Sequence, residues 1–74
     1  MNTTRQGLVG LTVNGDPHAV PEGTTVSDLV AALDVEPRGV AVAVGGDVVP
    51  RSSWPTHQVG PGDAVEILSV AQGG

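Results

Sequence analysis

One stretch of this sequence has the periodicity of a helix, and β-like patterns lie on both sides of it. Its apolar residues are spaced i, i+3, i+4 and i+7: Val26, Leu29, Val30 and Leu33. Thr24 or Thr25 is placed to cap the first turn, and Pro37 disfavours helical angles just before it, so the helix is expected to end near Asp34. Because so short a helix is marginal alone, it must pack against another layer.

The segment before this helix has the pattern of a β-hairpin. Apolar residues alternate from Val9 to Val13 and lead into Asn14-Gly15, a dipeptide that accepts the positive φ angles of a tight turn. The return arm, from Pro17 to Val20, begins with a residue that cannot donate a backbone hydrogen bond. We therefore expect this arm at an edge of the sheet.

Three further strands are expected after the helix. Valine and alanine alternate over residues 40–44, which favours an interior strand, and residues 48–50 form a brief one. The turn cluster at residues 60–63 precedes the last strand, residues 64–70. In that strand Val65 and Ile67 face one side, and the other side receives Glu66, Leu68 and Val70.

The order of these elements predicts an α+β domain with one main helix packed on a mixed sheet of four to five strands. The first and last strands are expected to lie side by side, in parallel. This order resembles the β-grasp, or ubiquitin-like, architecture, which by itself says little about chemistry. We expect one domain over residues 1–70 and a flexible tail over residues 71–74.

Composition excludes several classes of function. A chain of 74 residues buries only about 60% of its unfolded surface, which disfavours a deep active site. There is no cysteine, so disulfides, thiolate metal sites and thiol nucleophiles are excluded. The net charge of −5, with arginine as the only basic residue type, argues against nucleic acid as a partner. With no apolar run long enough for a signal peptide or a membrane span, we expect a cytoplasmic protein that does not contact membranes.

The polar side chains do not form a convincing catalytic or metal site. His18 and His57 have no partner ligand at helical spacing, so no metal is expected. Ser52, Ser53, His57 and Asp63 could be combined into a hydrolytic set, but nothing in their positions specifies a nucleophile and a base. We therefore assign no catalytic residue and expect that the protein is not an enzyme.

Two residues near the middle of the chain have open roles. Trp54, the sole aromatic residue, either closes the end of a thin aliphatic core or lies exposed as an anchor for a partner. Arg51 either pairs with a nearby carboxylate or contacts a partner.

The pair Gly73-Gly74, at the end of the sequence, is the feature that points to chemistry. Without Cβ atoms, such a tail can enter a narrow channel, and its carbonyl can be attacked without steric crowding. A carboxylate must first receive a leaving group, most simply AMP, before it accepts an amine, a thiolate or a persulfide. Because the chain has no lysine, an activated Gly74 cannot be captured by a side-chain amine of the same protein. This absence is equally explained by a compositional preference for arginine.

The sequence resembles a known family over most of its length. The telling residues are Val49-Pro50-Arg51 followed by Trp54, then Gly62-Asp63, and finally Gly73-Gly74. Together they are similar to the thiamine-pathway sulfur carriers, which are bacterial ubiquitin-like proteins. Gly62-Asp63 and the Gly-Gly end alone also suit the small subunit of molybdopterin synthase.

The resemblance implies a cycle of charging and discharge at Gly74, with Gly73 recognised as part of the tail. A ubiquitin-activating-type enzyme adenylates the Gly74 carboxylate with ATP, and sulfur from a persulfide donor then replaces AMP to give a thiocarboxylate. The sulfur passes to thiazole synthase. No cofactor is bound by the carrier itself, which is expected to be a monomer when free.

A docking surface is expected beside the tail, formed by Leu68 and Val70 with Val49 and Arg51 as further candidates. Three other functions remain open: a molybdopterin-type sulfur carrier, a protein modifier that forms isopeptide bonds through Gly74, and a β-grasp module with an inert tail.

Overall fold

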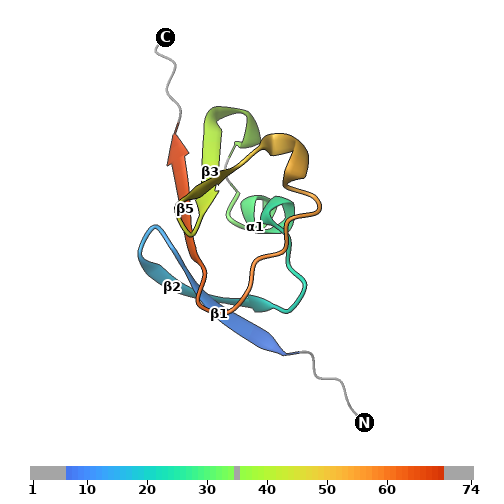
Figure 1. Cartoon of the computed structure of the whole chain (residues 1–74), viewed down its shortest axis with the longest axis vertical. Coiled ribbons are helices and arrows are strands. Elements are labelled where there is room, and N and C mark those ends of the chain that lie inside the picture. Colours follow the sequence, from blue (N-terminus) through green and yellow to red (C-terminus); the bar gives the residue numbers. More distant parts are fainter. Residues whose placement is uncertain (1–6, 35, 70–74) are drawn as a thin grey trace.

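The computed structural model describes residues 7–34 and 36–69, and the expected tail, residues 71–74, lies outside this range. Figure 1 shows the arrangement of the elements along the chain. In order they are β1 (Leu8–Val13), β2 (Asp16–Pro21), α1 (Val26–Ala32), the 3₁₀ turn η1 (Pro37–Gly39), β3 (Val40–Val44), β4 (Asp47–Val49), the 3₁₀ turn η2 (Arg51–Ser53) and β5 (Ala64–Ser69).

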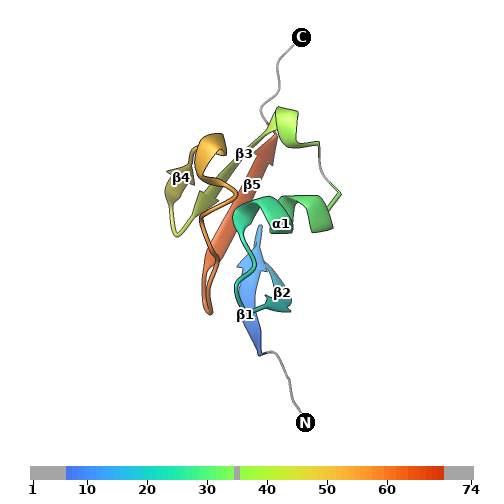
Figure 2. The same cartoon turned by 90° about the vertical axis from the view of Figure 1, so that its right-hand side faces the viewer.

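The strands form one mixed sheet in the order β2-β1-β5-β3-β4. β1 and β5 are the parallel pair, with Thr12 opposite Ala64 and Val13 opposite Val65, and the other neighbours are antiparallel. α1 and the segment between β4 and β5 lie on the same side of this sheet (Figures 1 and 2). The expected α+β architecture, with its central parallel pair and interior β3, is confirmed.

The first hairpin has the turn that the sequence predicts. Asn14 and Gly15 both have positive φ, 52° and 85°, as a two-residue turn of the hairpin type requires. The return strand β2 lies at the edge of the sheet, as its proline suggested.

One hydrogen bond shows which peptide groups of β2 point toward β1 and which point toward the open edge of the sheet. The Glu22 N–H donates to the Gly7 carbonyl, 3.0 Å away, so the peptide groups of even-numbered β2 residues point toward β1. Those of Pro17, Ala19 and Pro21 therefore point outward. Two of these three positions have no N–H to offer, which leaves the edge with a single outward donor at Ala19.

α1 begins and ends with identifiable caps. Thr25, rather than Thr24, is the N-cap: its Oγ1 accepts from the Asp28 N–H at 3.1 Å, and the Asp28 carboxylate accepts from the Thr25 N–H at 3.2 Å. At the other end Leu33 is the C-cap, and Asp34 takes a positive φ of 58°, a value that ends the helix where the sequence indicated.

The core lies between α1 and the sheet and consists of aliphatic side chains around one tryptophan. Its buried members are Leu11, Val13, Val26, Leu29, Val30, Val42, Val49, Trp54, Val59 and Val65. Trp54 is 5% exposed, and its indole N–H donates to the Val49 carbonyl at 3.0 Å. Trp54 therefore closes the core, and the alternative of an exposed anchor is wrong.

None of the helices within residues 7–34 and 36–69 has the length and apolar character needed to span a membrane.

Candidate functional site

β5 is the element that leads to the C-terminal glycines. It lies between β1 and β3, and its last described residue is Ser69. Val70, Gly73 and Gly74, three of the residues assigned to the site from sequence, lie outside the described residues. The part of the site that the structure describes is therefore β5 and the surface around its last residues.

The start of β5 is fixed by the Gly62-Asp63 pair. Gly62 has a φ of 80°, and the Asp63 carboxylate accepts a hydrogen bond from the Gly60 N–H at 2.7 Å. The Asp63 carbonyl accepts from the Thr12 N–H at 3.0 Å, which joins this turn to β1. These two residues of the family pattern therefore have a structural role, the placement of β5 beside β1.

The sheet face opposite α1 exposes two large apolar side chains, one near the end of β5 and one on β4. Leu68 is 55% exposed and lies opposite Ala41 of β3, while Val48 is 69% exposed and lies opposite Ala43. We call these four residues (Ala41, Ala43, Val48 and Leu68) the outer-face patch. Val48 and Leu68 are its exposed members, Ala43 is only 7% exposed, and the exposed Glu66 lies on the same face opposite Ala43. Because paired residues of antiparallel strands share a face, the patch runs across β5, β3 and β4.

Val49 does not belong to this surface, contrary to the sequence-based expectation. Its side chain is 5% exposed and lies in the core opposite Val42, and the neighbouring Val48 carries the exposed position. The sequence could not decide between them, because a strand of three residues with two adjacent valines reveals no alternation.

Arg51 lies apart from the outer-face patch. It is exposed, and its guanidinium carbon is 5.6 Å from the centroid of the Trp54 ring, a cation–π arrangement. Because Trp54 packs in the core on the α1 side of the sheet, Arg51 and Leu68 do not share a face. Arg51 and Leu68, the docking candidates that remain among the described residues, therefore lie on different surfaces.

The two histidines lie on different elements of the described structure. His18 lies on β2 and His57 in the segment between η2 and β5, both half-buried. Within residues 7–34 and 36–69, no three His, Cys, Asp or Glu side chains are grouped so that they could hold a metal ion.

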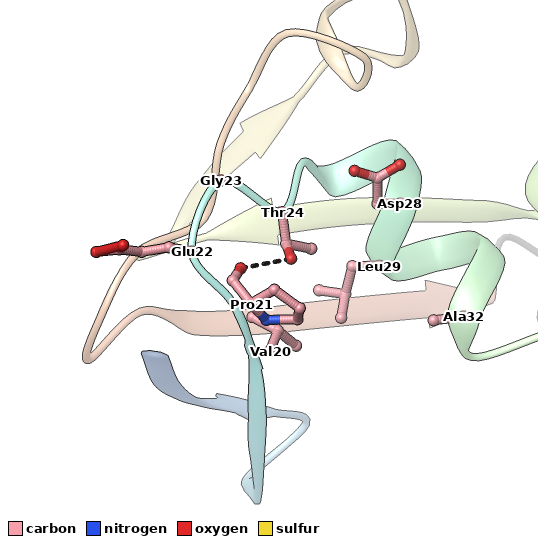
Figure 3. Close-up of a pocket in the computed structure, with 8 residues that line it drawn as sticks. All are labelled: Val20, Pro21, Glu22, Gly23, Thr24, Asp28, Leu29 and Ala32. Atoms are coloured by element: carbon pink, nitrogen blue, oxygen red, sulfur yellow. Dashed lines mark hydrogen bonds between the residues drawn. The ribbon is translucent and has the colours of Figure 1, made fainter. Parts of the chain in front are cut away.

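A groove of about 420 Å³ lies between the end of β2 and α1. Val20, Pro21, Leu29 and Ala32 contribute its apolar lining, and the carboxylates of Glu22 and Asp28 point away from it (Figure 3). The Thr24 hydroxyl at its edge donates to the Pro21 carbonyl at 2.6 Å. The groove therefore offers apolar contact area rather than a set of reactive groups.

The sequence analysis did not predict the contact of one turn residue with β5. Asn14 was expected only to form a turn, yet its side-chain amide contacts both backbone groups of Ile67. A contact between residues 53 positions apart leaves no local signal in the sequence.

Comparison with known proteins gives a consistent result. The sequence model of the ThiS family matches residues 10–74. The sulfur carrier protein ThiS of Escherichia coli is 38% identical over 52 residues, which cover 70% of this chain and 79% of that protein. ThiS of Thermus thermophilus is 32% identical over 62 residues, covering 84% of this chain and 95% of the relative.

A longer relative and a solved structure complete the comparison. A thiazole synthase of Paramagnetospirillum magneticum is 36% identical over 64 residues, 86% of this chain but only 20% of that protein. The crystal structure of a thiamine biosynthesis protein, ThiS, from Geobacter metallireducens is 39% identical, with a TM-score of 0.79, and the match covers 89% of this chain and all of that one. The chain therefore belongs to the ThiS family.

Proposed function

We propose that this protein carries sulfur for thiazole formation in thiamine biosynthesis, with the Gly74 carboxylate as the group that is charged. The observation that carries this proposal is the family match, which extends through the β-grasp domain and includes Gly73-Gly74. Relatives named sulfur carrier protein that align over most of their own length support the same role.

The proposed chemistry begins with activation of the carboxylate. An oxygen of Gly74 attacks the α-phosphate of ATP in a ubiquitin-activating-type enzyme, and pyrophosphate leaves, which gives an acyl adenylate. The terminal sulfur of a persulfide donor then attacks the carbonyl carbon and expels AMP. A thiol then attacks the donor's sulfur in the resulting S–S bond, which forms a disulfide between that thiol and the donor and leaves the thiocarboxylate on Gly74. The protein supplies the carboxylate and is recharged after each transfer.

We propose thiazole synthase as the acceptor of this sulfur. In Paramagnetospirillum magneticum, a segment similar to this chain is contained within a polypeptide named thiazole synthase. Two functions joined in one chain meet at a high effective concentration, which is an advantage when one acts on the product of the other. This arrangement supports a direct encounter between the separate carrier and its acceptor.

We propose that the outer-face patch docks the carrier on its partners, with Leu68 as its main contact beside the tail. Fully burying a leucine side chain contributes about 1.5–3 kcal/mol, enough to change an affinity by tenfold or more. The acidic net charge of −5 favours partner surfaces with basic residues around an apolar centre.

Genetic rescue tests the pathway. In a strain that lacks its own thiamine sulfur carrier, the intact chain is expected to restore growth without added thiazole, and a chain without Gly73-Gly74 is not. Failure of the intact chain there, together with rescue of a strain lacking the small subunit of molybdopterin synthase, would assign it to the other pathway.

The Leu68→Asp substitution tests the docking surface. We expect adenylation at limiting carrier concentration to fall at least tenfold, with the free energy of unfolding changed by no more than about 0.5 kcal/mol because the site is exposed. Leu8→Asp is the matched control, since Leu8 is 68% exposed at the start of β1, the opposite end of the sheet from the end of β5 (Figure 1). Equal activity of the two variants would show that the patch does not dock.

A further inference from the structure

The two halves of β5 are supported differently by their neighbours. On one side β3 pairs with every residue from Val65 to Ser69. On the other side β1 pairs only with Ala64 and Val65. β1 ends at Val13 and turns away into the hairpin, so the half of β5 nearest the tail has a neighbouring strand on one side only.

Asn14 continues the ladder past the end of β1. Its backbone N–H donates to the Val65 carbonyl at 2.8 Å. Its side chain then acts as one further peptide group: Oδ1 accepts from the Ile67 N–H at 2.9 Å, and Nδ2 donates to the Ile67 carbonyl at 3.2 Å. Both backbone groups that Ile67 directs toward β1 are thereby satisfied.

Few residue types can fill this position. A φ of 52° at residue 14 is accepted by glycine, asparagine and aspartate but strains most side chains. Glycine has no amide, and aspartate has acceptors but no donor for the Ile67 carbonyl. Asparagine alone among these three makes the turn and also offers both a donor and an acceptor.

We infer that Asn14 is a positioning residue for the tail: its amide holds Ile67 so that β5 stays paired up to the start of the segment leading to Gly74. This inference rests on the proposed function. Without the amide, the end of β5 is held only by β3 and frays more often. A partner must then reorder the end of β5 during docking. This cost weakens binding of the carrier without altering the reacting groups at Gly74.

The test compares Asn14→Gly, Asn14→Asp and a control elsewhere in the fold. Asn14→Gly keeps the turn and removes both side-chain hydrogen bonds, whereas Asn14→Asp keeps only the acceptor for the Ile67 N–H. Thr25→Ala is the control, because it removes the cap of α1 and lowers stability without touching β5. All four proteins are compared by amide hydrogen exchange and by ATP–pyrophosphate exchange with an adenylating enzyme that charges a ThiS relative.

In Asn14→Gly we expect the protection of the Ile67 amide to fall about tenfold relative to that of Leu11 in β1. The KM for the carrier is expected to rise about three- to tenfold, with kcat within about twofold of the original value. For Asn14→Asp, both the protection of Ile67 and the KM should lie between those of the original protein and those of Asn14→Gly. Thr25→Ala should lower the midpoint of thermal unfolding and leave both the relative protection of Ile67 and the KM unchanged.

Three results would count against this inference. Unchanged protection of Ile67 in Asn14→Gly would show that the amide does not hold β5. Lost protection with an unchanged KM would show that the contact is structural only. A rise in KM of the same size in Thr25→Ala would trace the effect to stability in general. If the original protein itself is not adenylated, the proposed function fails, and hydrogen exchange still decides whether Asn14 holds Ile67.

Discussion

Trp54 stabilises the domain in two ways that substitution can separate. Its ring fills the end of the aliphatic core, and its N–H satisfies the Val49 carbonyl. Trp54→Phe keeps much of the ring and loses the hydrogen bond, so we expect a loss of about 1 kcal/mol in the free energy of unfolding. Trp54→Ala also leaves a cavity, and should cost about 3–5 kcal/mol. Urea unfolding followed by far-ultraviolet circular dichroism measures both, since neither variant retains tryptophan fluorescence.

Val48→Ala is the reference for these two variants, because Val48 is 69% exposed and its truncation should change stability by no more than about 0.5 kcal/mol. A loss for Trp54→Phe as large as that for Trp54→Ala would contradict the division between packing and hydrogen bonding.

The roles of single residues were predictable where they depend on near neighbours in the chain. A cap at Thr24 or Thr25 and a turn at Asn14-Gly15 were both predicted, and the structure selects Thr25, whose partner Asp28 lies three positions later. The bond between Asn14 and Ile67 was not predictable, since it depends on which strands become neighbours. A three-residue strand was also too short to show that Val49 faces inward.

We expect the prolines of the edge strand β2 to hinder its pairing with another chain. Pro17 and Pro21 remove two of the three outward-facing donors along this strand. Replacing both by valine restores those donors and is expected to produce dimers or larger species at high protein concentration, whereas the original chain stays monomeric. Size-exclusion chromatography with light scattering distinguishes these states.

Pro55→Val is the control for the edge, because Pro55 lies in the exposed segment after η2, away from β2. A Pro17→Val, Pro21→Val protein that stays monomeric at the highest soluble concentration would contradict the proposed role of the two prolines.

Strands and helix were largely predictable because their apolar periods differ. The alternation in β1, β3 and β5 and the helical spacing in α1 each identify one element. In β3 the alternation does not mark a single buried face, since the adjacent Val42 and Ala43 are both buried. The 3₁₀ turns η1 and η2 were not predicted, since three residues are too few to show a period. The path of the segment after η2 was also not predicted. It is fixed by contacts with the start of α1, among them the Val26 N–H bonding to the His57 carbonyl at 2.8 Å.

The molecule as a whole is a domain of the ThiS family, and its features fit the proposed role of a carrier that presents a carboxylate to partner enzymes. Its core consists of aliphatic side chains around Trp54, the chain is acidic and contains no lysine, and Leu68 of the outer-face patch lies near the end of β5. If Gly74 is activated as proposed, the absence of lysine prevents it from forming an isopeptide bond with a side chain of the same protein. These features suit a protein that is activated by one enzyme and discharged by another.

The most direct test is the intact mass of the protein after incubation with ATP, a sulfur source and a cell extract that charges a known ThiS relative, with fragmentation to locate any change. We predict a gain equal to the replacement of one oxygen by sulfur, confined to Gly74. An unchanged Gly74 in that extract would contradict the sulfur-carrier account, and Gly74 joined to lysines of other proteins would identify a protein modifier instead.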